Sequence, residues 1–253
     1  LARAIKQIPE NQSANERERK IIENKYKKNK EFIGTIKNAS TTVQVGLVVI
    51  EPRTGAILAM VGASPKFMKE NRDAKYSLNH ITQIKRQPGS TFKPIVYTSA
   101  LQEGLTPQSS VGCGPFTYTL PSGEVWTPSG THDCAEGETK SLTQALALSI
   151  NTASARLITE VTTPAKVVAL AKELGIKSKL YSVPSLSLGG GGEVTPLEMT
   201  AAFIPFANDG IYTEPFAITK VEDNYGNVLY ENKKYSVKSV LKQDIVRNMT
   251  YML

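Results

Sequence analysis

The pattern of apolar and polar positions predicts a β-hairpin near residue 50. Residues 41–63, TTVQVGLVVIEPRTGAILAMVGA, contain two runs rich in β-branched residues with Pro-Arg-Thr-Gly between them. Such runs joined by a short turn sequence are typical of hairpins. A second pair of strands is predicted at residues 215–223 and 227–232, PFAITKVED and NVLYEN, around a Gly-containing turn.

Helical patterns fill the chain between these strands. We expect a helix from about Ser90 to Gly104, because a glycine often ends a helix. Further helices are expected at residues 141–148, 152–160, 164–174 and about 240–253, and a polar loop is expected at 64–80. Strands near both ends with helices between them indicate an α+β or mixed α/β domain.

One further helix carries a complete start signal. Thr195 precedes an apolar run, Pro196 takes the first helical position, and Glu198 follows three residues after the threonine. This is the pattern of a capping box. The LGGGG sequence before it lacks the Lys-Ser/Thr of a phosphate loop and the spaced glycines of a dinucleotide loop. We interpret these glycines as allowing a loop to pass close to a cleft.

Residues 1–40 are polar, charged and weakly patterned, so we interpret them as a charged linker or interdomain segment before a domain at 41–253. Much of the net charge of +7 lies there, but glutamates are mixed in and no aromatic residues are spaced for stacking on bases. We therefore expect no nucleic-acid partner. With 40% hydrophobic and 21% charged residues, the chain has an ordinary globular composition, and no run approaches the ~18–20 apolar residues of a membrane span.

The two cysteines, Cys113 and Cys134, flank a stretch rich in Gly, Pro and Ser. This arrangement suits a disulfide formed in an oxidising compartment, but two free thiols are also compatible with it. A zinc site is disfavoured, because His132 is the one further ligand candidate of a suitable kind nearby.

The first candidate catalytic residues lie in KRQPGSTFKPIVYTSAL, where Ser90 follows Pro-Gly and Lys93 comes three residues later. Helical positions i and i+3 share a face, so these side chains meet near a helix N-terminus, which favours developing negative charge. A serine hydroxyl becomes nucleophilic when a base takes its proton, and a lysine can be that base when burial or a neighbouring cation lowers its pKa. The apolar flank FKPIVY indicates such burial.

Ser-x-x-Lys alone decides little, because it arises by chance roughly once in a chain of this length. A second copy at Ser239 and Lys242 lies in a highly charged segment, which indicates an exposed helix face. A different motif, Ser149 and Asn151 in ALALSINTASARL, falls on the predicted connection between two apolar helices. It offers a hydroxyl and an amide.

Three stretches together, RQPGSTFKPIVYTSAL, LTQALALSINTASARL and LGGGGEVTPLEMTAAFIPFANDG, resemble the transpeptidase domain of class A penicillin-binding proteins in order and spacing. The resemblance implies the penicillin-binding transpeptidase and serine β-lactamase-like fold, with a central antiparallel sheet flanked by helices. It also implies a D,D-transpeptidase that cross-links peptidoglycan stem peptides ending in D-Ala-D-Ala through an acyl-serine, and that β-lactams acylate. No cofactor and no metal are expected.

The resemblance also implies roles for individual residues. Ser90 would be the nucleophile, Lys93 its base, Ser149 a proton relay towards the leaving group, and Asn151 a hydrogen-bonding partner of the substrate backbone. Trp126 matches an aromatic residue that relatives often place on the cleft rim, although a core position suits it equally well. An upstream glycosyltransferase domain is implied as well. So is a location on the extracytoplasmic face of the bacterial cell membrane, with the anchor outside this chain.

The third motif of the family, Lys-Thr/Ser-Gly on a strand lining the cleft, is absent from these 253 residues. The triplet Arg53–Gly55 imitates it, but lies in the first hairpin turn. We expect the domain at 41–253 to lack its C-terminal part, so that a further segment or second chain carrying the motif completes the site. The alternatives are a β-lactam-hydrolysing relative, for which we find no matching glutamate motif, and a non-catalytic relative that binds β-lactams or cell-wall peptide.

Overall fold

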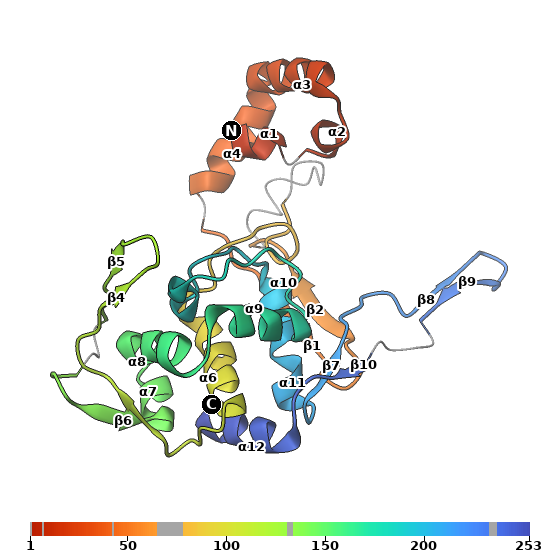
Figure 1. Cartoon of the computed structure of the whole chain (residues 1–253). Helices are drawn as coiled ribbons and strands as arrows, with labels where there is room; N and C mark the ends of the chain where they lie inside the picture. The colour runs from red at the N-terminus through yellow and green to blue at the C-terminus, as the bar shows by residue number, and fades with distance from the viewer. Residues whose placement is uncertain (1, 7, 42, 65–77, 131–133, 233–236) are drawn as a thin grey trace. The chain divides into compact units, whose positions relative to one another are not determined.

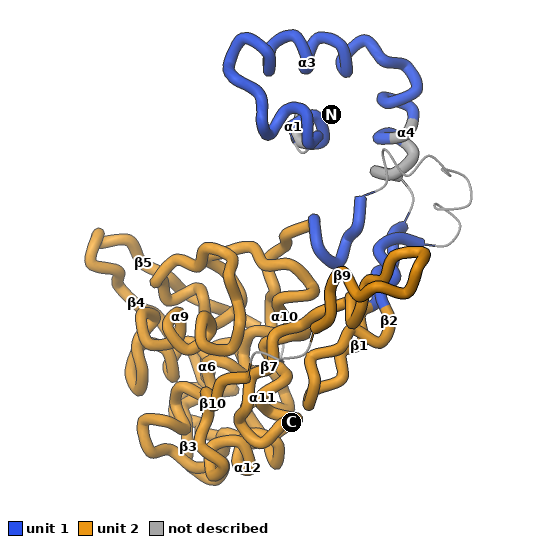
Figure 2. The backbone as a smooth tube through the Cα atoms, turned by 90° about the vertical axis from the view of Figure 1, so that its right-hand side faces the viewer, with its two compact units in different colours: residues 1–47, 60–83 blue, residues 48–59, 84–253 orange. Residues whose placement is uncertain are grey.

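The computed structural model describes residues 2–6, 8–41, 43–64, 78–130, 134–232 and 237–253. The chain divides into two compact units, of which unit 1 comprises residues 1–47 and 60–83 and unit 2 comprises residues 48–59 and 84–253 (Figure 2). Most of the loop predicted at 64–80, and also His132, lie outside the described residues. All the predicted site residues belong to unit 2.

Unit 1 is helical over most of its first forty residues. Its helices there are α1 (Ala2–Lys6), α2 (Pro9–Gln12), α3 (Glu16–Lys28) and α4 (Lys30–Thr41) (Figure 1). Ile5, Tyr26 and Phe32 are buried in one small apolar cluster. The expectation of a weakly patterned segment therefore missed these helices. Local signals for these helices are present, since Asn15 and Glu18 form a capping box at the start of α3 and Ile22 and Tyr26 share one of its faces. The cluster itself exists because separate helices meet.

The helices of unit 2 include all the predicted ones to within a few residues. They are the 3-10 turn η2 (Gly89–Phe92), α6 (Lys93–Gln102), α7 (Leu142–Ala147), α8 (Asn151–Arg156) with its π-helical continuation η3 (Leu157–Val161), α9 (Pro164–Glu173), the 3-10 turn η4 (Pro184–Leu188), α10 (Pro196–Ala202), α11 (Ile204–Ala207) and α12 (Gln243–Met252). The 3-10 turn η4 is not among the predicted elements. None of the described helices is long and apolar enough to cross a lipid bilayer.

The strands pair in twos. The two predicted hairpins are β1 (Leu47–Ile50) with β2 (Ile57–Val61), and β8 (Lys220–Glu222) with β9 (Val228–Glu231). The other three pairs are β3 (Ser110–Gly112) with β6 (Thr139–Ser141), β4 (Tyr118–Thr119) with β5 (Val125–Trp126), and β7 (Ile211–Thr213) with β10 (Val237–Ser239). Among the described residues there are thus five two-stranded sheets rather than one larger central sheet. Beside β2, Phe216 makes a single bridge to Ala56 and no full strand.

Helix α6 is the centre of the unit 2 core. Its residues from Lys93 to Leu101 are all buried, and it contacts α7, α8, α9, α12 and η4 (Figure 1). A helix that is covered on all sides belongs in the interior of a domain. Because Lys93 is its first residue, the same packing carries a basic side chain into the core.

Helix α10 begins with the predicted capping box. Thr195 Oγ1 accepts from the Glu198 N–H at 3.1 Å, and Glu198 Oε2 accepts from the Thr195 N–H at 2.8 Å. Glu198 also accepts from the N–H and the hydroxyl of Ser178, which ties the turn after α9 to α10. Burial by itself would raise the pKa of Glu198, but the hydrogen bonds from Thr195 and Ser178 hold it below its ordinary value.

Tyr97 should make unit 2 sensitive to alkaline pH. Burial in α6 raises the pKa of its phenol to about 12, against an opposing effect of Ser154. An unfolded tyrosine ionises near pH ~10, so the unfolded state gains charge first and stability falls as pH rises from about 10 to about 12. We expect this to amount to up to about 3 kcal/mol of unfolding free energy, and Tyr97→Phe to abolish it.

Urea unfolding at neutral pH and at pH ~11, where about half of this loss is expected, measures the effect. Tyr225→Phe is the matched control, because its side chain is 91% exposed. An alkaline loss of the same size in Tyr97→Phe and in the wild type would contradict the assignment.

Candidate active site

Ser90 stands on a tight turn at the entrance to the core helix. Gly89 has φ of 59°, in the left-handed region that glycine adopts readily. Ser90 follows in η2 and is exposed, and its carbonyl accepts the Lys93 N–H at the start of α6. The hydroxyl-bearing residue is thus at the surface, while Lys93, one turn later, is 1% exposed.

The Lys93 ammonium reaches the connection between α7 and α8. Its Nζ donates to the Ser149 carbonyl at 2.5 Å, to Ser149 Oγ at 2.9 Å and to Asn151 Oδ1 at 2.7 Å. These three contacts match the three N–H donors of an ammonium, which offsets the cost of burying its charge. The structure therefore brings Lys93, Ser149 and Asn151 together, and Ser90 stands one turn before Lys93.

Ser149 adopts a backbone conformation that is unusual for serine. Its φ is 53°, and it follows the C-cap of α7. Its N–H bonds to the Leu146 carbonyl and the Ile150 N–H to the Ala145 carbonyl, which is the Schellman pattern that normally has glycine at this position. Both the carbonyl and the hydroxyl of this strained residue contact Lys93, and strained residues cluster at functional sites.

The glycine-rich stretch braces the turn that carries Ser90. Gly189 has φ of 76°, and a Cβ placed on it would lie 2.6 Å from Gly89 Cα. On the other side, Arg86 and Val194 exchange two backbone hydrogen bonds of 3.0 and 2.9 Å. Of the predicted close-passing glycines, Gly189 is the one whose neighbour is the turn that carries Ser90.

Asn151 links the site to the stretch between the two cysteines. Its Nδ2 donates to the Ser129 carbonyl at 2.8 Å. Trp126, which is half-buried and pairs with Tyr118 across the β4–β5 hairpin, precedes Ser129 in the same stretch. The structure thus connects Trp126 to the site through the chain, and its role on a cleft rim stays a prediction. Sequence reasoning missed Ser129, because a backbone carbonyl leaves no signal in residue type.

Cys113 and Cys134 form a disulfide, which settles the alternative that the sequence left open. Glu138 lies near both sulfurs. Since each sulfur is bonded to the other, neither is a thiolate that could hold a metal ion.

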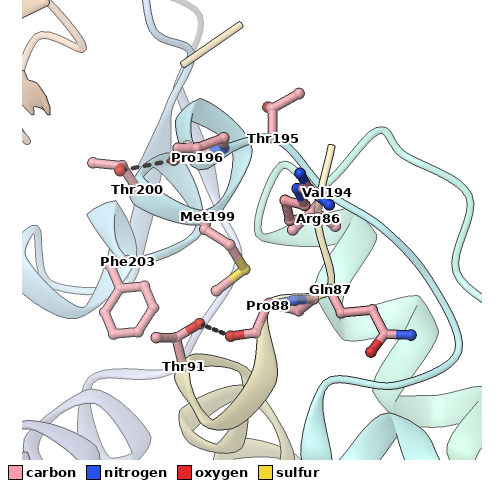
Figure 3. Close-up of a pocket in the computed structure, with 10 residues that line it drawn as sticks. All are labelled: Arg86, Gln87, Pro88, Thr91, Val194, Thr195, Pro196, Met199, Thr200 and Phe203. Carbon is pink, nitrogen blue, oxygen red and sulfur yellow. Dashed lines mark hydrogen bonds between the residues drawn. The ribbon is translucent and has the colours of Figure 1, made fainter. Parts of the chain in front are cut away.

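An apolar cavity of about 520 Å³ opens beside the Ser90 turn (Figure 3). Pro88 and Thr91 line one side, where the Thr91 hydroxyl donates to the Pro88 carbonyl at 2.6 Å. Met199 and Phe203, from the α10 side, line the other. The cavity therefore lies against the turn that carries the candidate nucleophile, and Ser90 itself does not line it.

A family model described as the penicillin binding protein transpeptidase domain matches residues 45–253. The chain belongs to this family. Penicillin-binding protein 2D of Bacillus subtilis (strain 168) is 40% identical over 197 residues, which are 77% of this chain and 27% of that protein. Penicillin-binding protein 1A of Aquifex aeolicus (strain VF5) is 41% identical over 188 residues, 74% of this chain and 24% of that one. Class A fits these relatives, and the chain spans about a quarter of their length.

Solved structures of penicillin-binding proteins share the fold. Penicillin-binding protein 1A from Haemophilus influenzae has a TM-score of 0.72 at 24% identity, covering 83% of this chain and 34% of that one. The imipenem acyl-enzyme complex of penicillin-binding protein A from M. tuberculosis has a TM-score of 0.68 at 21% identity, covering 83% and 56%. These similarities confirm the predicted α+β penicillin-binding transpeptidase fold.

Two substitutions of Ser149 separate the effect of its backbone strain from the effect of its hydroxyl. Ser149→Gly and Ser149→Ala both remove the hydroxyl, but only glycine relieves the left-handed strain. We expect the glycine variant to unfold with about 1 kcal/mol more free energy than the alanine variant, and both to lose acylation by penicillin equally. Urea unfolding and a labelled-penicillin assay measure the two effects. Equal stabilities would mean that Ser149 carries no strain.

Gly189→Ala tests the brace behind Ser90. The added methyl group must displace Gly89, so we expect a loss of at least about 2 kcal/mol of unfolding free energy and slower acylation. Gly104→Ala is the matched control, because Gly104 has φ of 99° but nothing within 4 Å of the position that its methyl group would take. If both variants lose the same stability, backbone strain alone explains the effect and the close approach to Gly89 does not matter.

Proposed function

We propose that this chain provides the acylating site of a serine-type peptidoglycan D,D-transpeptidase. The observation that carries the proposal is the buried Lys93, one turn after Ser90, with its Nζ held by Ser149 and Asn151. These are the Ser-x-x-Lys and Ser-x-Asn motifs of the family to which the chain belongs. A buried lysine next to an exposed serine is the arrangement that activates such a nucleophile.

In the first half-reaction, Ser90 Oγ attacks the carbonyl carbon of the penultimate D-Ala of a stem peptide. An O–C bond forms, the C–N bond to the terminal D-Ala breaks, and an acyl-serine results. Lys93 acts here as the neutral amine: its lone pair takes the proton of Ser90, and the resulting ammonium passes a proton through the Ser149 hydroxyl to the departing amine. Ser149 Oγ suits this relay, because it is 2.9 Å from Lys93 Nζ and a hydroxyl both accepts and donates.

The second half-reaction reverses these steps with a new amine. The amine of a neighbouring stem peptide attacks the acyl-serine, its proton goes to Lys93, and Ser90 is released with its proton restored. In each tetrahedral intermediate, the Ser90 N–H at the start of the helix provides one donor to the oxyanion. Asn151 binds the substrate backbone, and Trp126 lines the rim of the cleft.

β-Lactams stop this cycle by acylating the same serine, since they present a strained amide that resembles D-Ala-D-Ala. We further propose that a segment carrying Lys-Thr/Ser-Gly, which residues 1–253 lack, supplies the second oxyanion donor and the docking edge for the peptide. In the whole protein, a glycosyltransferase domain lies upstream. The site faces the extracytoplasmic side of the bacterial cell membrane, and a segment outside this chain provides the anchor.

The test is intact-mass analysis after benzylpenicillin treatment, with the adduct mapped by peptide. We expect one adduct on Ser90 in the full natural chain, and Lys93→Ala to slow its formation by two orders of magnitude or more (~10²–10⁴-fold). Lys242→Ala, in the second Ser-x-x-Lys copy, is the matched control and should acylate normally.

Three outcomes would contradict the proposal. An adduct on another residue, or an unaffected rate in Lys93→Ala, removes the assigned nucleophile or base. Rapid loss of the adduct by hydrolysis indicates a β-lactamase instead. Residues 1–253 alone should acylate more slowly than the chain extended by the Lys-Thr/Ser-Gly segment, and equal rates would show that this segment is not required.

A further inference from the structure

The first turns of α8 hold the stretch between the cysteines by its backbone. We call residues 113–134 the disulfide loop; its residues 131–133 lie outside the described part. Asn151 Nδ2 donates to the Ser129 carbonyl at 2.8 Å, Thr152 Oγ1 to the Cys113 carbonyl at 2.7 Å, and Arg156 Nη2 to the Pro115 carbonyl at 2.9 Å. One short helix thus binds both ends of the loop.

Asn151 is shared between this loop and the candidate active site. Its Oδ1 accepts from Lys93 Nζ at 2.7 Å, while its Nδ2 donates to the Ser129 carbonyl. A side-chain amide has an acceptor on one side and donors on the other. Rotating this amide by 180° would set its NH₂ group against the ammonium and its oxygen against a carbonyl. The Ser129 carbonyl therefore selects the orientation in which Oδ1 faces Lys93.

The disulfide holds Ser129 in reach of this amide. Cys113 is fully buried in the core cluster, and its carbonyl accepts from the Cys134 N–H at 2.9 Å as well as from Thr152. Ser129 lies five residues before Cys134, so the S–S bond tethers its end of the loop to the buried Cys113. Without that bond, the backbone hydrogen bond from Cys134 is the remaining described link between the two cysteines.

We propose that the disulfide loop is a positioning element of the acylating site: the Cys113–Cys134 bond keeps the Ser129 carbonyl against Asn151, which orients the amide towards Lys93. This rests on the proposed function. Reduction of the Cys113–Cys134 bond by a dithiol then removes this positioning effect. The dithiol gives two electrons and two protons to the S–S bond, which becomes two thiols, and is itself oxidised to a disulfide. Ser90 acylation slows as a result.

Gly130→Ala perturbs the same contact without touching the disulfide. A Cβ on Gly130 would lie 3.0 Å from Asn151 Nδ2 and 3.3 Å from its Cγ. Gly123→Ala is the matched control in the same loop, because Gly123 has a strained φ of 85° but no atom within 4 Å of the added methyl position. If loop stability in general mattered, the Gly123 variant would be affected as well.

The first measurement follows the side-chain amide of Asn151 by ¹⁵N NMR in the full natural chain, before and after dithiothreitol treatment, and is independent of acylation. We expect its resonances to shift on reduction and in Gly130→Ala. Those of Asn208, whose Nδ2 donates to the Ile211 carbonyl at 3.1 Å, should stay unchanged. An Asn151 signal that does not respond to reduction overturns the proposal.

The second measurement is the rate of benzylpenicillin acylation below the unfolding temperature. Reduction and Gly130→Ala should each lower the saturated acylation rate by on the order of 10-fold, with little change in the apparent affinity. Together they should lower it no further than either alone, since they break one contact. A Cys113→Ala/Cys134→Ala double variant should acylate at the reduced rate with or without dithiothreitol.

The outcomes separate the two proposals. Equal rates in the oxidised and reduced protein, or effects of reduction and Gly130→Ala that multiply, overturn the positioning role. An oxidised wild type that never acylates, yet shows the shift of Asn151 on reduction, overturns the proposed function and supports the orientation of the amide by the loop.

Discussion

The site depends on burying a lysine in the core of unit 2 without leaving its charge unpaired. Lys93 is carried inward by α6, which is covered on all sides by other elements. An isolated ammonium there would be very costly, so its position is possible because the Ser149–Asn151 connection presents three oxygen atoms to it. This interaction joins segments 56 residues apart in sequence. It also places the Ser149 hydroxyl and the Asn151 amide within hydrogen-bonding distance of Lys93 Nζ.

Two backbone features provide the geometry for this interaction. Ser149 accepts a left-handed conformation that glycine would adopt with less strain, and the hydroxyl that glycine lacks contacts Lys93. Gly189 is a glycine because its backbone approaches Gly89 too closely for a side chain, whereas Gly89 has free space around it but a left-handed φ of 59° that glycine adopts readily. The residue types at these three positions thus follow from three demands, which are a functional group at Ser149, space at Gly189 and backbone conformation at Gly89.

The disulfide loop is the third segment that contacts the candidate active site, after α6 and the connection between α7 and α8. It is held by Asn151, Thr152 and Arg156, three side chains of one helix. Asn151 binds both the loop and Lys93, because its Nδ2 donates to the Ser129 carbonyl and its Oδ1 accepts from Lys93 Nζ. The two contacts use different atoms and require the same orientation of the amide. Asn151 is therefore the side chain through which, on the proposal above, a change in the loop reaches the site.

The sequence by itself determined the elements that depend on nearby residues. The capping box of Thr195 and Glu198, the first hairpin and the helix after Ser90 all follow from interactions within a few positions, and the motifs around Lys93 and Ser149 identified the residues that meet. Tertiary structure alone decided the pairing of Cys113 with Cys134, the partner of Gly189 and the carbonyl that binds Asn151. It also decided that Ile5, Tyr26 and Phe32, which come from separate helices, meet in one apolar cluster. These features depend on contacts between distant segments or on backbone atoms that every residue has, so no local pattern of residue types records them.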